Sequence, residues 1–316
     1  MSKAIKKLLV AIPVILILMI VSCYFLFPGV VLKILEDMER GAAGLDQRSI
    51  DIGNLHIEYL EGGQGEVLVL LHGFGGDKDN WTRVAKYLTP HFRVVAPDLP
   101  GFGESSRDME AAYTYAAQVD RLHEFMKALG VNKFHLGGNS MGGAIAGFYT
   151  AKFRNNVISL WLIAPGGIIS PQPSELYQSL KSGKGNPLIV ETEKDYELLL
   201  DFIFVKRPFI PGAIKRHFLR EAIDHRPLNQ IIFKQIKSTD NFVPLEVLLK
   251  NLQTPTLILW GDMDRVLHIS GAKILEAVMP NAKSVIMEEV GHLPMLEKPE
   301  ESADIFLNFL SEKGTL

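Results

Sequence analysis

The chain has 316 residues, of which 47% are hydrophobic, and a formal net charge of −3. This length and composition allow a sizeable buried core and fit one α/β domain that carries an insertion. The charge gives no sign of the basic surface used in nucleic-acid binding, so we expect no nucleic-acid partner. Cys23 is the single cysteine, which excludes an intramolecular disulfide. No cysteine or histidine cluster has metal-ligand spacing and no glycine motif matches a nucleotide-binding loop, so we expect neither metal nor cofactor.

The first 32 residues differ in composition from the rest of the chain. Lys3, Lys6 and Lys7 precede an uncharged run over residues 8–32, and about 20 apolar residues are enough to cross a bilayer as a helix. We therefore expect residues 1–32 to form a membrane anchor, a transmembrane or signal-anchor helix. Basic residues before the span favour a cytoplasmic N-terminus, which places the remainder of the chain on the extracytoplasmic side.

A cleaved lipoprotein signal is a second interpretation of the same segment. Residues 8–21 fit the apolar region of a signal peptide, and Ile20-Val21-Ser22-Cys23 resembles a lipobox that ends at the lipid-bearing cysteine. The apolar residues 24–27 continue where a polar tether is usual, which favours the uncleaved anchor. Both interpretations place the protein at a membrane.

The next residues predict a linker and then an α/β core. Residues 33–49 carry mixed charges and are expected to form a juxtamembrane linker, and residues 49–60 predict an early pair of antiparallel strands. Apolar strand-like runs then alternate with helix-like runs such as residues 120–129. This alternation is typical of a mostly parallel, doubly wound sheet with helices on both faces. We expect the core to occupy residues 50–165 and 253–316.

One apolar strand-like run ends in a glycine-rich turn. Residues 66–71 are followed by His72-Gly73-Phe74-Gly75-Gly76, where glycines let backbone N–H groups turn inward toward a substrate oxygen. We expect the Phe74 N–H to be one such donor and His72 to support the loop. Asp98, which follows the next strand-like run, is expected to hold a turn.

Gly138-Asn139-Ser140-Met141-Gly142 lies between a strand-like and a helix-like run. A G-x-S-x-G sequence at such a turn holds its serine in a strained, exposed position, and side chains at the glycine positions would collide across the turn. Ser140 is therefore the predicted nucleophile, with the Met141 N–H as second oxyanion donor. Taken alone, the motif also fits a glycine-rich turn with a bystander serine. The presence of a base and an acid as partners of Ser140 decides between the two interpretations.

Residues 166–252 lack strand-like alternation and separate the two parts of the core. Helix-like runs at residues 196–204 and 214–222 predict a helical cap over the strand ends. Most of its apolar residues are expected to pack within the cap, and a minority to line a ligand pocket. The apolar residues of the predicted cap, taken together, are Phe202, Phe204, Phe209, Ile210, Phe218, Leu219, Ile231, Ile232 and Phe233.

The second part of the core supplies a candidate acid. The strand-like run 256–260 precedes a loop that contains Asp262 and Asp264. We choose Asp264 as the residue that orients a catalytic histidine, because it lies deeper in the loop, where the chain can turn back. Asp262 is expected to cap the loop or to face water.

His292 is the predicted general base. It follows the last strand-like run, residues 284–287, and the carboxyl ends of parallel strands are where an open sheet assembles its site. His135 lies inside a strand-like run and is expected to pack there. The other histidines are expected at the surface or in packing contacts: His56, His91, His123, His217, His225 and His268.

Five segments in this order resemble the α/β-hydrolase superfamily. They are LVLLHGFGG (68–76), VVAPDLPGFGES (94–105), LGGNSMGG (136–143), LILWGDMD (257–264) and VGHLPMLEKPE (290–300). HGFGGDKDNW (72–81) and DFIFVKRPFIP (201–211) further resemble membrane-associated acylglycerol lipases of the ABHD6 type and lipases of cold-adapted bacteria.

The resemblance implies a serine hydrolase that cleaves carboxylic esters of lipids through an acyl-enzyme. It implies Ser140, Asp264 and His292 as the triad, with Phe74 and Met141 at the oxyanion hole. Haloalkane dehalogenases and epoxide hydrolases of this fold are excluded because they use an aspartate nucleophile. A meta-cleavage-product C–C hydrolase stays an alternative, since that class has a similar serine turn, although its soluble substrates fit poorly with a membrane segment. A non-catalytic ligand-binding member of the fold is the other alternative.

Overall fold

The computed structural model describes residues 12–13, 25–238 and 242–316. Most of the expected membrane anchor, residues 1–32, therefore lies outside the described residues. Among the residues that are described, no helix is both long and apolar enough to cross a membrane. Helix α2 (Pro28–Ala42) occupies the end of the expected anchor and more than half of the expected linker at residues 33–49.

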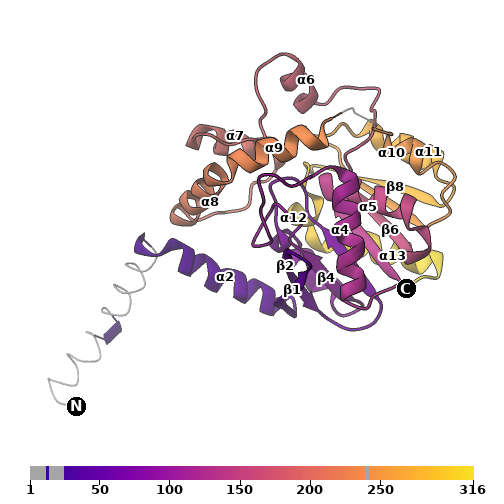
Figure 1. Ribbon diagram of the computed structural model, residues 1–316, viewed down its shortest axis with the longest axis horizontal. Helices are drawn as coiled ribbons and strands as arrows, with labels where there is room; N and C mark the ends of the chain where they lie inside the picture. Colours follow the sequence, from indigo (N-terminus) through magenta and orange to yellow (C-terminus); the bar gives the residue numbers. More distant parts are fainter. Residues whose placement is uncertain (1–11, 14–24, 239–241) are drawn as a thin grey trace.

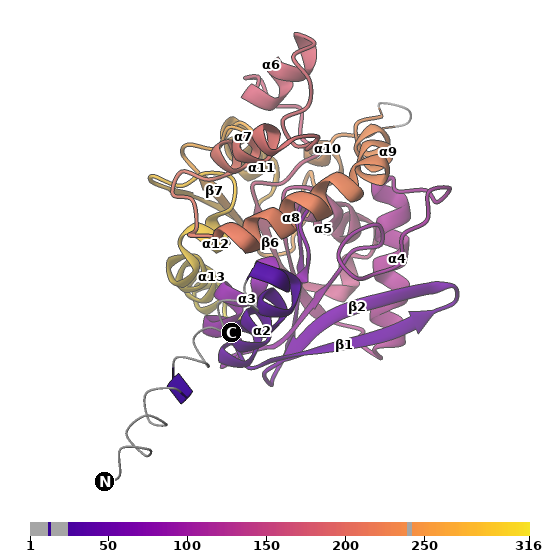
Figure 2. The same cartoon turned by 90° about the vertical axis from the view of Figure 1, so that its left-hand side faces the viewer.

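A mostly parallel sheet forms the centre of the molecule (Figures 1 and 2). Its eight strands are β1 (Leu45–Ile52), β2 (Leu55–Gly62), β3 (Val67–Leu71), β4 (Arg93–Pro97), β5 (Phe134–Asn139), β6 (Val157–Ile163), β7 (Thr256–Gly261) and β8 (Ala282–Met287). They lie in the order β1-β2-β4-β3-β5-β6-β7-β8. The pairs β1–β2 and β2–β4 are antiparallel and the others are parallel.

The sheet confirms the expected architecture and moves one boundary. The predicted antiparallel pair is present as β1 and β2, but β1 begins at Leu45 rather than near residue 50. Leu45 pairs with Gly62 and is 3% exposed, so burial of one apolar side chain extends the strand into the expected linker. The mixed charges of that segment concealed this start.

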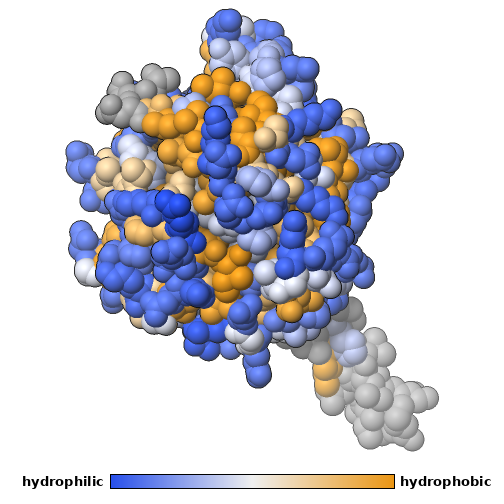
Figure 3. Space-filling view, turned by 90° about the vertical axis from the view of Figure 1, so that its right-hand side faces the viewer, coloured by the Kyte–Doolittle hydropathy of each residue, from blue (hydrophilic) through white to orange (hydrophobic). Residues whose placement is uncertain are grey.

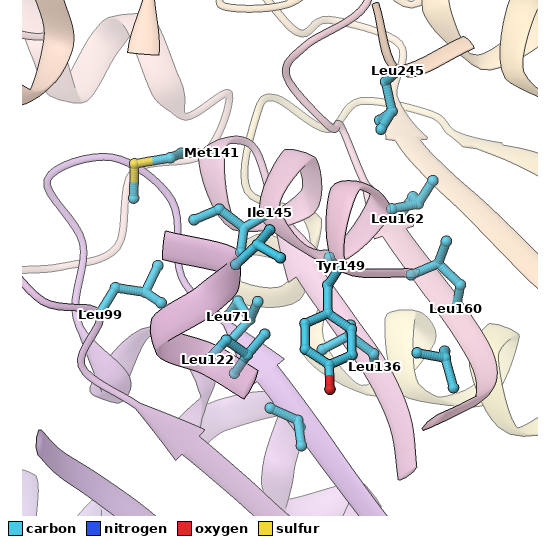
Figure 4. Close-up of a cluster of buried hydrophobic side chains, with 14 of the residues drawn as sticks. Leu71, Leu99, Leu122, Leu136, Met141, Ile145, Tyr149, Leu160, Leu162 and Leu245 are labelled. Carbon is cyan, nitrogen blue, oxygen red and sulfur yellow. The ribbon is translucent and has the colours of Figure 1, made fainter. Parts of the chain in front are cut away.

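Helices cover both faces of the sheet. They are α3 (Thr82–Leu88), α4 (Tyr115–Ala128), α5 (Met141–Lys152), α11 (Ser270–Val278), α12 (Pro294–Glu297) and α13 (Pro299–Lys313), with short 3-10 helices η1 (Lys78–Trp81) and η2 (Arg154–Asn156). Successive strand residues point to opposite faces, so Leu71 packs toward α4 and α5, whereas Leu70 packs toward α3 and α13. Figure 4 shows the first of these clusters, in which Ile145 and Tyr149 of α5 lie over the strands.

Helices without an intervening strand connect β6 to β7 in the described part of that segment (Figure 1). They are α6 (Glu175–Lys181), α7 (Glu193–Ile203), α8 (Gly212–Asp224), α9 (Arg226–Ile236) and α10 (Leu245–Leu248). The predicted helical runs 196–204 and 214–222 correspond to α7 and α8. The connection therefore has the helical content expected of a cap.

The apolar residues of this connection differ in where they pack. Four of the nine predicted cap residues, Phe204, Ile210, Phe218 and Leu219, form a cluster within the connection. Phe209, in contrast, is 90% exposed. The face that carries α10 and α11 is largely hydrophilic, with apolar residues gathered in its upper part (Figure 3). Composition alone did not distinguish the packed members of the set from the exposed ones.

A buried ion pair joins the loops that follow β3 and β4. Asp98 is fully buried and accepts hydrogen bonds from the Lys78 backbone N–H (2.7 Å), from Lys78 Nζ (2.9 Å) and from the Glu104 N–H (2.8 Å). Gly103 has a φ of +52°, and a Cβ built there would lie 2.1 Å from Asp98 Cγ, so only glycine permits this approach. The expected structural role of Asp98 is confirmed.

We predict that Lys78→Met lowers the free energy of unfolding by about 3–5 kcal/mol, because it leaves the Asp98 carboxylate buried without its cation. Urea denaturation measures the change. The double variant Lys78→Met/Asp98→Asn removes both charges and is expected to recover part of the loss. An unchanged free energy in the single variant would show that the pair contributes no stability.

Candidate active site

Ser140 occupies a strained turn between β5 and α5. Its backbone angles are φ 55° and ψ −116°, and its N–H donates to the Ile163 carbonyl at 2.9 Å. A Cβ on Gly138 would lie 2.3 Å from the Gly142 carbonyl oxygen, and a Cβ on Gly142 would lie 2.2 Å from the Leu71 carbonyl oxygen. Side chains cannot be accommodated at either glycine, so the predicted reason for the G-x-S-x-G sequence is confirmed. A positive φ at a non-glycine residue costs on the order of 1–3 kcal/mol and is often found at functional sites.

His292 and Asp264 form a buried pair. His292 Nδ1 lies 2.8 Å from Asp264 Oδ2, and the two residues are 5% and 9% exposed. Asp264 Oδ1 accepts from the backbone N–H groups of Val266 (2.8 Å) and Leu267 (3.0 Å). A carboxylate only accepts hydrogen bonds, so the proton of the neutral ring is placed on Nδ1 and the lone pair on Nε2. That is the form in which a histidine can accept a proton from a nucleophile.

Asp262 does not contact the imidazole. Its side chain is exposed, and Oδ1 accepts one long hydrogen bond from the Val290 N–H at 3.3 Å. Of the two candidate acids, only Asp264 is placed behind His292.

Asn139 connects the serine turn to the histidine loop. Its side-chain amide donates to the His292 carbonyl at 3.0 Å and to the Ile163 carbonyl at 3.2 Å. The hydrogen bonds of the described residues join the His292 ring to Asp264 but not to Ser140 Oγ. Hydrogen bonds of this kind are often long before substrate binds, so the serine–histidine contact stays a prediction.

The glycine-rich loop after β3 packs against the serine. His72 is fully buried; its Nδ1 donates to the Gly73 carbonyl (2.8 Å) and its Nε2 accepts from the Leu99 N–H (2.9 Å), which confirms its supporting role. Burial lowers the pKa of His72, which keeps the ring neutral. A Cβ on Gly73 would lie 3.2 Å from Ser140 Cβ, so Phe74 follows a residue that lies close to the predicted nucleophile.

The two predicted oxyanion donors come from different segments that meet at this point. Met141 is the first residue of α5, where backbone N–H groups have no partner within the helix. The Phe74 ring makes edge contacts with Phe102 (centroids 5.8 Å apart) and with Phe233 of α9 (5.4 Å). The ring of Phe74, a predicted oxyanion donor, is thus covered by an apolar side chain of the connection between β6 and β7. The oxyanion hole itself stays a prediction.

Comparisons with known proteins agree on a family. A family model described as the alpha/beta hydrolase fold matches residues 66–193. Lipase 1 of Psychrobacter immobilis is 38% identical over 279 residues, which cover 86% of each chain. The chain belongs to the α/β-hydrolase family. Monoacylglycerol lipase ABHD6 of Homo sapiens is 30% identical over 306 residues, covering 93% of this α/β-hydrolase and 91% of the human protein.

Solved structures give the same fold. The crystal structure of a membrane phospholipase A, described as a bacterial virulence factor, has a TM-score of 0.88 at 42% identity, covering 97% of this α/β-hydrolase and 98% of that chain. The structure of a serine hydrolase involved in carbazole degradation has a TM-score of 0.72 at 26% identity, covering 84% and 99%.

Trp260 is a site residue that sequence reasoning missed. Its indole N–H donates to Asp264 Oδ2 at 3.0 Å and to the Leu267 carbonyl at 3.1 Å. In this α/β-hydrolase, the oxygen that accepts from His292 is therefore held by a second donor. The apolar run 256–260 placed Trp260 in a strand and gave it no other role. The spacing of four residues between Trp260 and Asp264 is the one sequence signal that could have indicated their contact.

Glu297 is a second missed residue, and it ties the histidine loop to the connection between β6 and β7. Its Oε1 accepts from the Gly291 N–H (2.8 Å), and its Oε2 accepts from the N–H groups of Val205 (2.9 Å) and Lys206 (3.0 Å). The His292 N–H donates to the Ile203 carbonyl at 2.9 Å. The position of His292 thus depends on a segment that lies far away in the sequence.

We predict that Trp260→Phe lowers kcat/KM for a p-nitrophenyl ester by about tenfold or more, since a hydrogen bond to a charged group contributes about 1.5–3 kcal/mol. Trp161→Phe is the matched control. Trp161 is fully buried and stacked on Phe306, and its indole N–H has no acceptor among the described residues. Equal losses in both variants would assign the effect to packing rather than to the hydrogen bond.

We predict that Asp264→Asn lowers kcat by on the order of 10⁴-fold, because an amide cannot hold the required tautomer of His292 or balance its positive charge. Asp262→Asn changes the same chemical group two residues away and is expected to leave the rate unchanged. Steady-state kinetics on one ester substrate measures both variants. A large loss in Asp262→Asn with a small one in Asp264→Asn would reverse the assignment.

Proposed function

We propose that the protein is a lipase that cleaves carboxylic esters of lipids, with acylglycerols as substrates, through an acyl-enzyme. Ser140 is the nucleophile, His292 the general base and Asp264 the acid that orients it. The observation that carries the proposal is the buried Asp264–His292 hydrogen bond beside the strained Ser140 turn. Relatives named lipase and monoacylglycerol lipase, at 30–38% identity over 86–93% of the chain, support a lipid ester as the substrate.

The proposed chemistry follows from the placement of these groups. His292 Nε2 takes the proton of Ser140 as Oγ attacks the ester carbonyl carbon, and the N–H groups of Phe74 and Met141 stabilise the resulting oxyanion. Each such donor contributes about 3 kcal/mol to lowering the barrier. His292 then gives the proton to the leaving alcohol, which leaves an acyl-enzyme. Water repeats the sequence and releases the fatty acid.

An apolar surface beside the serine supports the lipid substrate. The half-buried rings of Phe74 and Phe233 pack edge to face, so a chain bound over the predicted oxyanion hole meets aromatic side chains. Phe233 belongs to α9 within residues 166–252, which we propose as the cap between the core segments 50–165 and 253–316. In this arrangement α9 separates the acyl chain from water.

We propose that residues 1–32 anchor the protein in a membrane, with the catalytic domain on the extracytoplasmic side. The uncharged run over residues 8–32 and the lysines before it support this placement. A lipase anchored in this way acts on esters at or near the bilayer surface.

The test is hydrolysis by the purified full chain in detergent micelles. We expect fatty acid release from acylglycerols, and no turnover of a meta-cleavage dienone acid, which would be the substrate of a C–C hydrolase. Ser140→Ala is expected to abolish activity and His292→Ala to lower it by several orders of magnitude, because triad members act as a unit. His268→Ala, four residues beyond Asp264, is the control and is expected to retain activity.

A fluorophosphonate probe distinguishes an enzyme from a ligand-binding member of the fold. We expect the probe to label Ser140. Failure to label, or turnover of the dienone acid alone, would contradict the proposed function.

A further inference from the structure

Helix α2 carries a stripe of exposed apolar residues, while Arg40 and Glu36 are turned toward the protein. Val30, Ile34 and Met38 recur at a spacing of four residues and therefore share one face of the helix. They are 53%, 53% and 66% exposed. Glu36 and Arg40, on the opposite face, are turned toward the domain, and Arg40 is 4% exposed. A helix on a water-soluble surface is expected to turn such an apolar stripe toward the core rather than outward.

Polar contacts, rather than an apolar interface, hold α2 in place. Arg40 Nε and one terminal nitrogen each donate at 2.6 Å to the two carboxylate oxygens of Asp79, and the other terminal nitrogen donates to Gln47 at 2.7 Å. Gly29, at the start of the helix, lies against His217 of α8, where an added Cβ would be 3.2 Å from the ring. Figure 2 shows α2 below α8 and beside β1 and β2. Arg40 is therefore satisfied by the protein, and Val30, Ile34 and Met38 are left outward.

The residues that precede α2 indicate what covers its apolar face. The uncharged run over residues 8–32, the proposed anchor, ends within the first turns of α2. A helix that follows directly from such a segment starts at the membrane surface, where an apolar face is buried in the boundary between headgroups and acyl chains. A second copy of the chain is a poorer match, because a stripe on one helix is narrow against the about 1,200–2,000 Å² that stable interfaces bury.

The charges of α2 indicate that the contact is apolar. The helix carries two basic residues and three acidic ones, Lys33 and Arg40 against Glu36, Asp37 and Glu39, which gives a net charge of −1. A helix of this charge gains nothing from anionic headgroups, whereas basic interfacial helices depend on them. Contact through Val30, Ile34 and Met38 is thus expected to be independent of the lipid charge.

We propose that α2 lies in the plane of the bilayer surface, with Val30, Ile34 and Met38 inserted among the lipids. The inference rests on the proposed anchor and goes beyond it, because it fixes how the domain is oriented. Asp79, the partner of Arg40, belongs to η1, which follows the glycine-rich loop that carries Phe74. The loop with a predicted oxyanion donor is thereby attached to the helix that meets the membrane.

The experiment places a fluorophore on each face of the full chain. Ile34→Cys, Met38→Cys and Ile286→Cys are labelled with an environment-sensitive dye, and the parent chain, whose single cysteine is Cys23, gives the background. Ile286 lies on β8, at the far end of the sheet from β1, and is 40% exposed, so it is a matched apolar control. The vesicles consist of ether-linked phosphatidylcholine, which an ester hydrolase cannot cleave. Retained ester hydrolysis confirms that each labelled chain is folded.

We expect a lipid-borne quencher to reduce emission at positions 34 and 38 several-fold more than at position 286, and aqueous iodide to show the opposite order. Adding ether-linked phosphatidylglycerol is expected to leave this order unchanged. The chain could float with the vesicles and yet show the same iodide quenching at positions 34 and 38 as at position 286. That result would overturn the inference about α2 and leave the proposed anchor standing. Protection from both quenchers, with energy transfer between labelled copies, would assign the stripe to a second copy and also overturn it. A chain that does not float would contradict the proposed anchor and this inference together.

Discussion

The site depends on one buried carboxylate and the donors that surround it. Asp264 accepts hydrogen bonds from the His292 ring, the Trp260 indole and two backbone N–H groups of its own loop. A buried charge with fewer partners would be costly, and the group would then favour its neutral form. These four donors satisfy the buried carboxylate, which is thereby placed to stabilise the positive charge that His292 acquires in the proposed mechanism. The loop after β7 is thus shaped by the need to satisfy Asp264.

The parallel sheet brings that carboxylate to the serine, and contacts with the connection between β6 and β7 complete the arrangement. Loops after β3, β5, β7 and β8 meet because the carboxyl ends of parallel strands share one edge of the sheet. Asn139 holds the His292 loop from the serine turn, and Glu297 of α12 ties the same loop to the segment after α7. The histidine is positioned by three separate parts of the chain, so its geometry is a property of the assembled domain.

Residues whose role is fixed by local sequence could be predicted, and those whose role depends on distant contacts could not. Ser140, Asp264 and His292 each follow a strand-like run, so the pattern alone placed them at the same edge of the sheet. Trp260 reads as one more apolar strand residue, because a sequence does not reveal where an indole N–H points. The start of β1 and the outward apolar stripe of α2 were missed for the same reason, since both depend on which face of a segment meets the domain.

The charges between α2 and the predicted active-site loops explain why Arg40 of α2 is turned toward the domain. Arg40 compensates the half-buried carboxylate of Asp79, and Lys78 compensates the buried carboxylate of Asp98. Asp77, half-buried beside them, has its pKa raised to about 8 by burial and by these two carboxylates, so a further negative charge in the cluster is disfavoured. The cluster therefore needs the guanidinium of α2, and turning Arg40 inward leaves Val30, Ile34 and Met38, on the other side of the helix, facing outward. Close charge compensation around the glycine-rich loop and an apolar surface toward the membrane are, on this view, two results of one packing constraint.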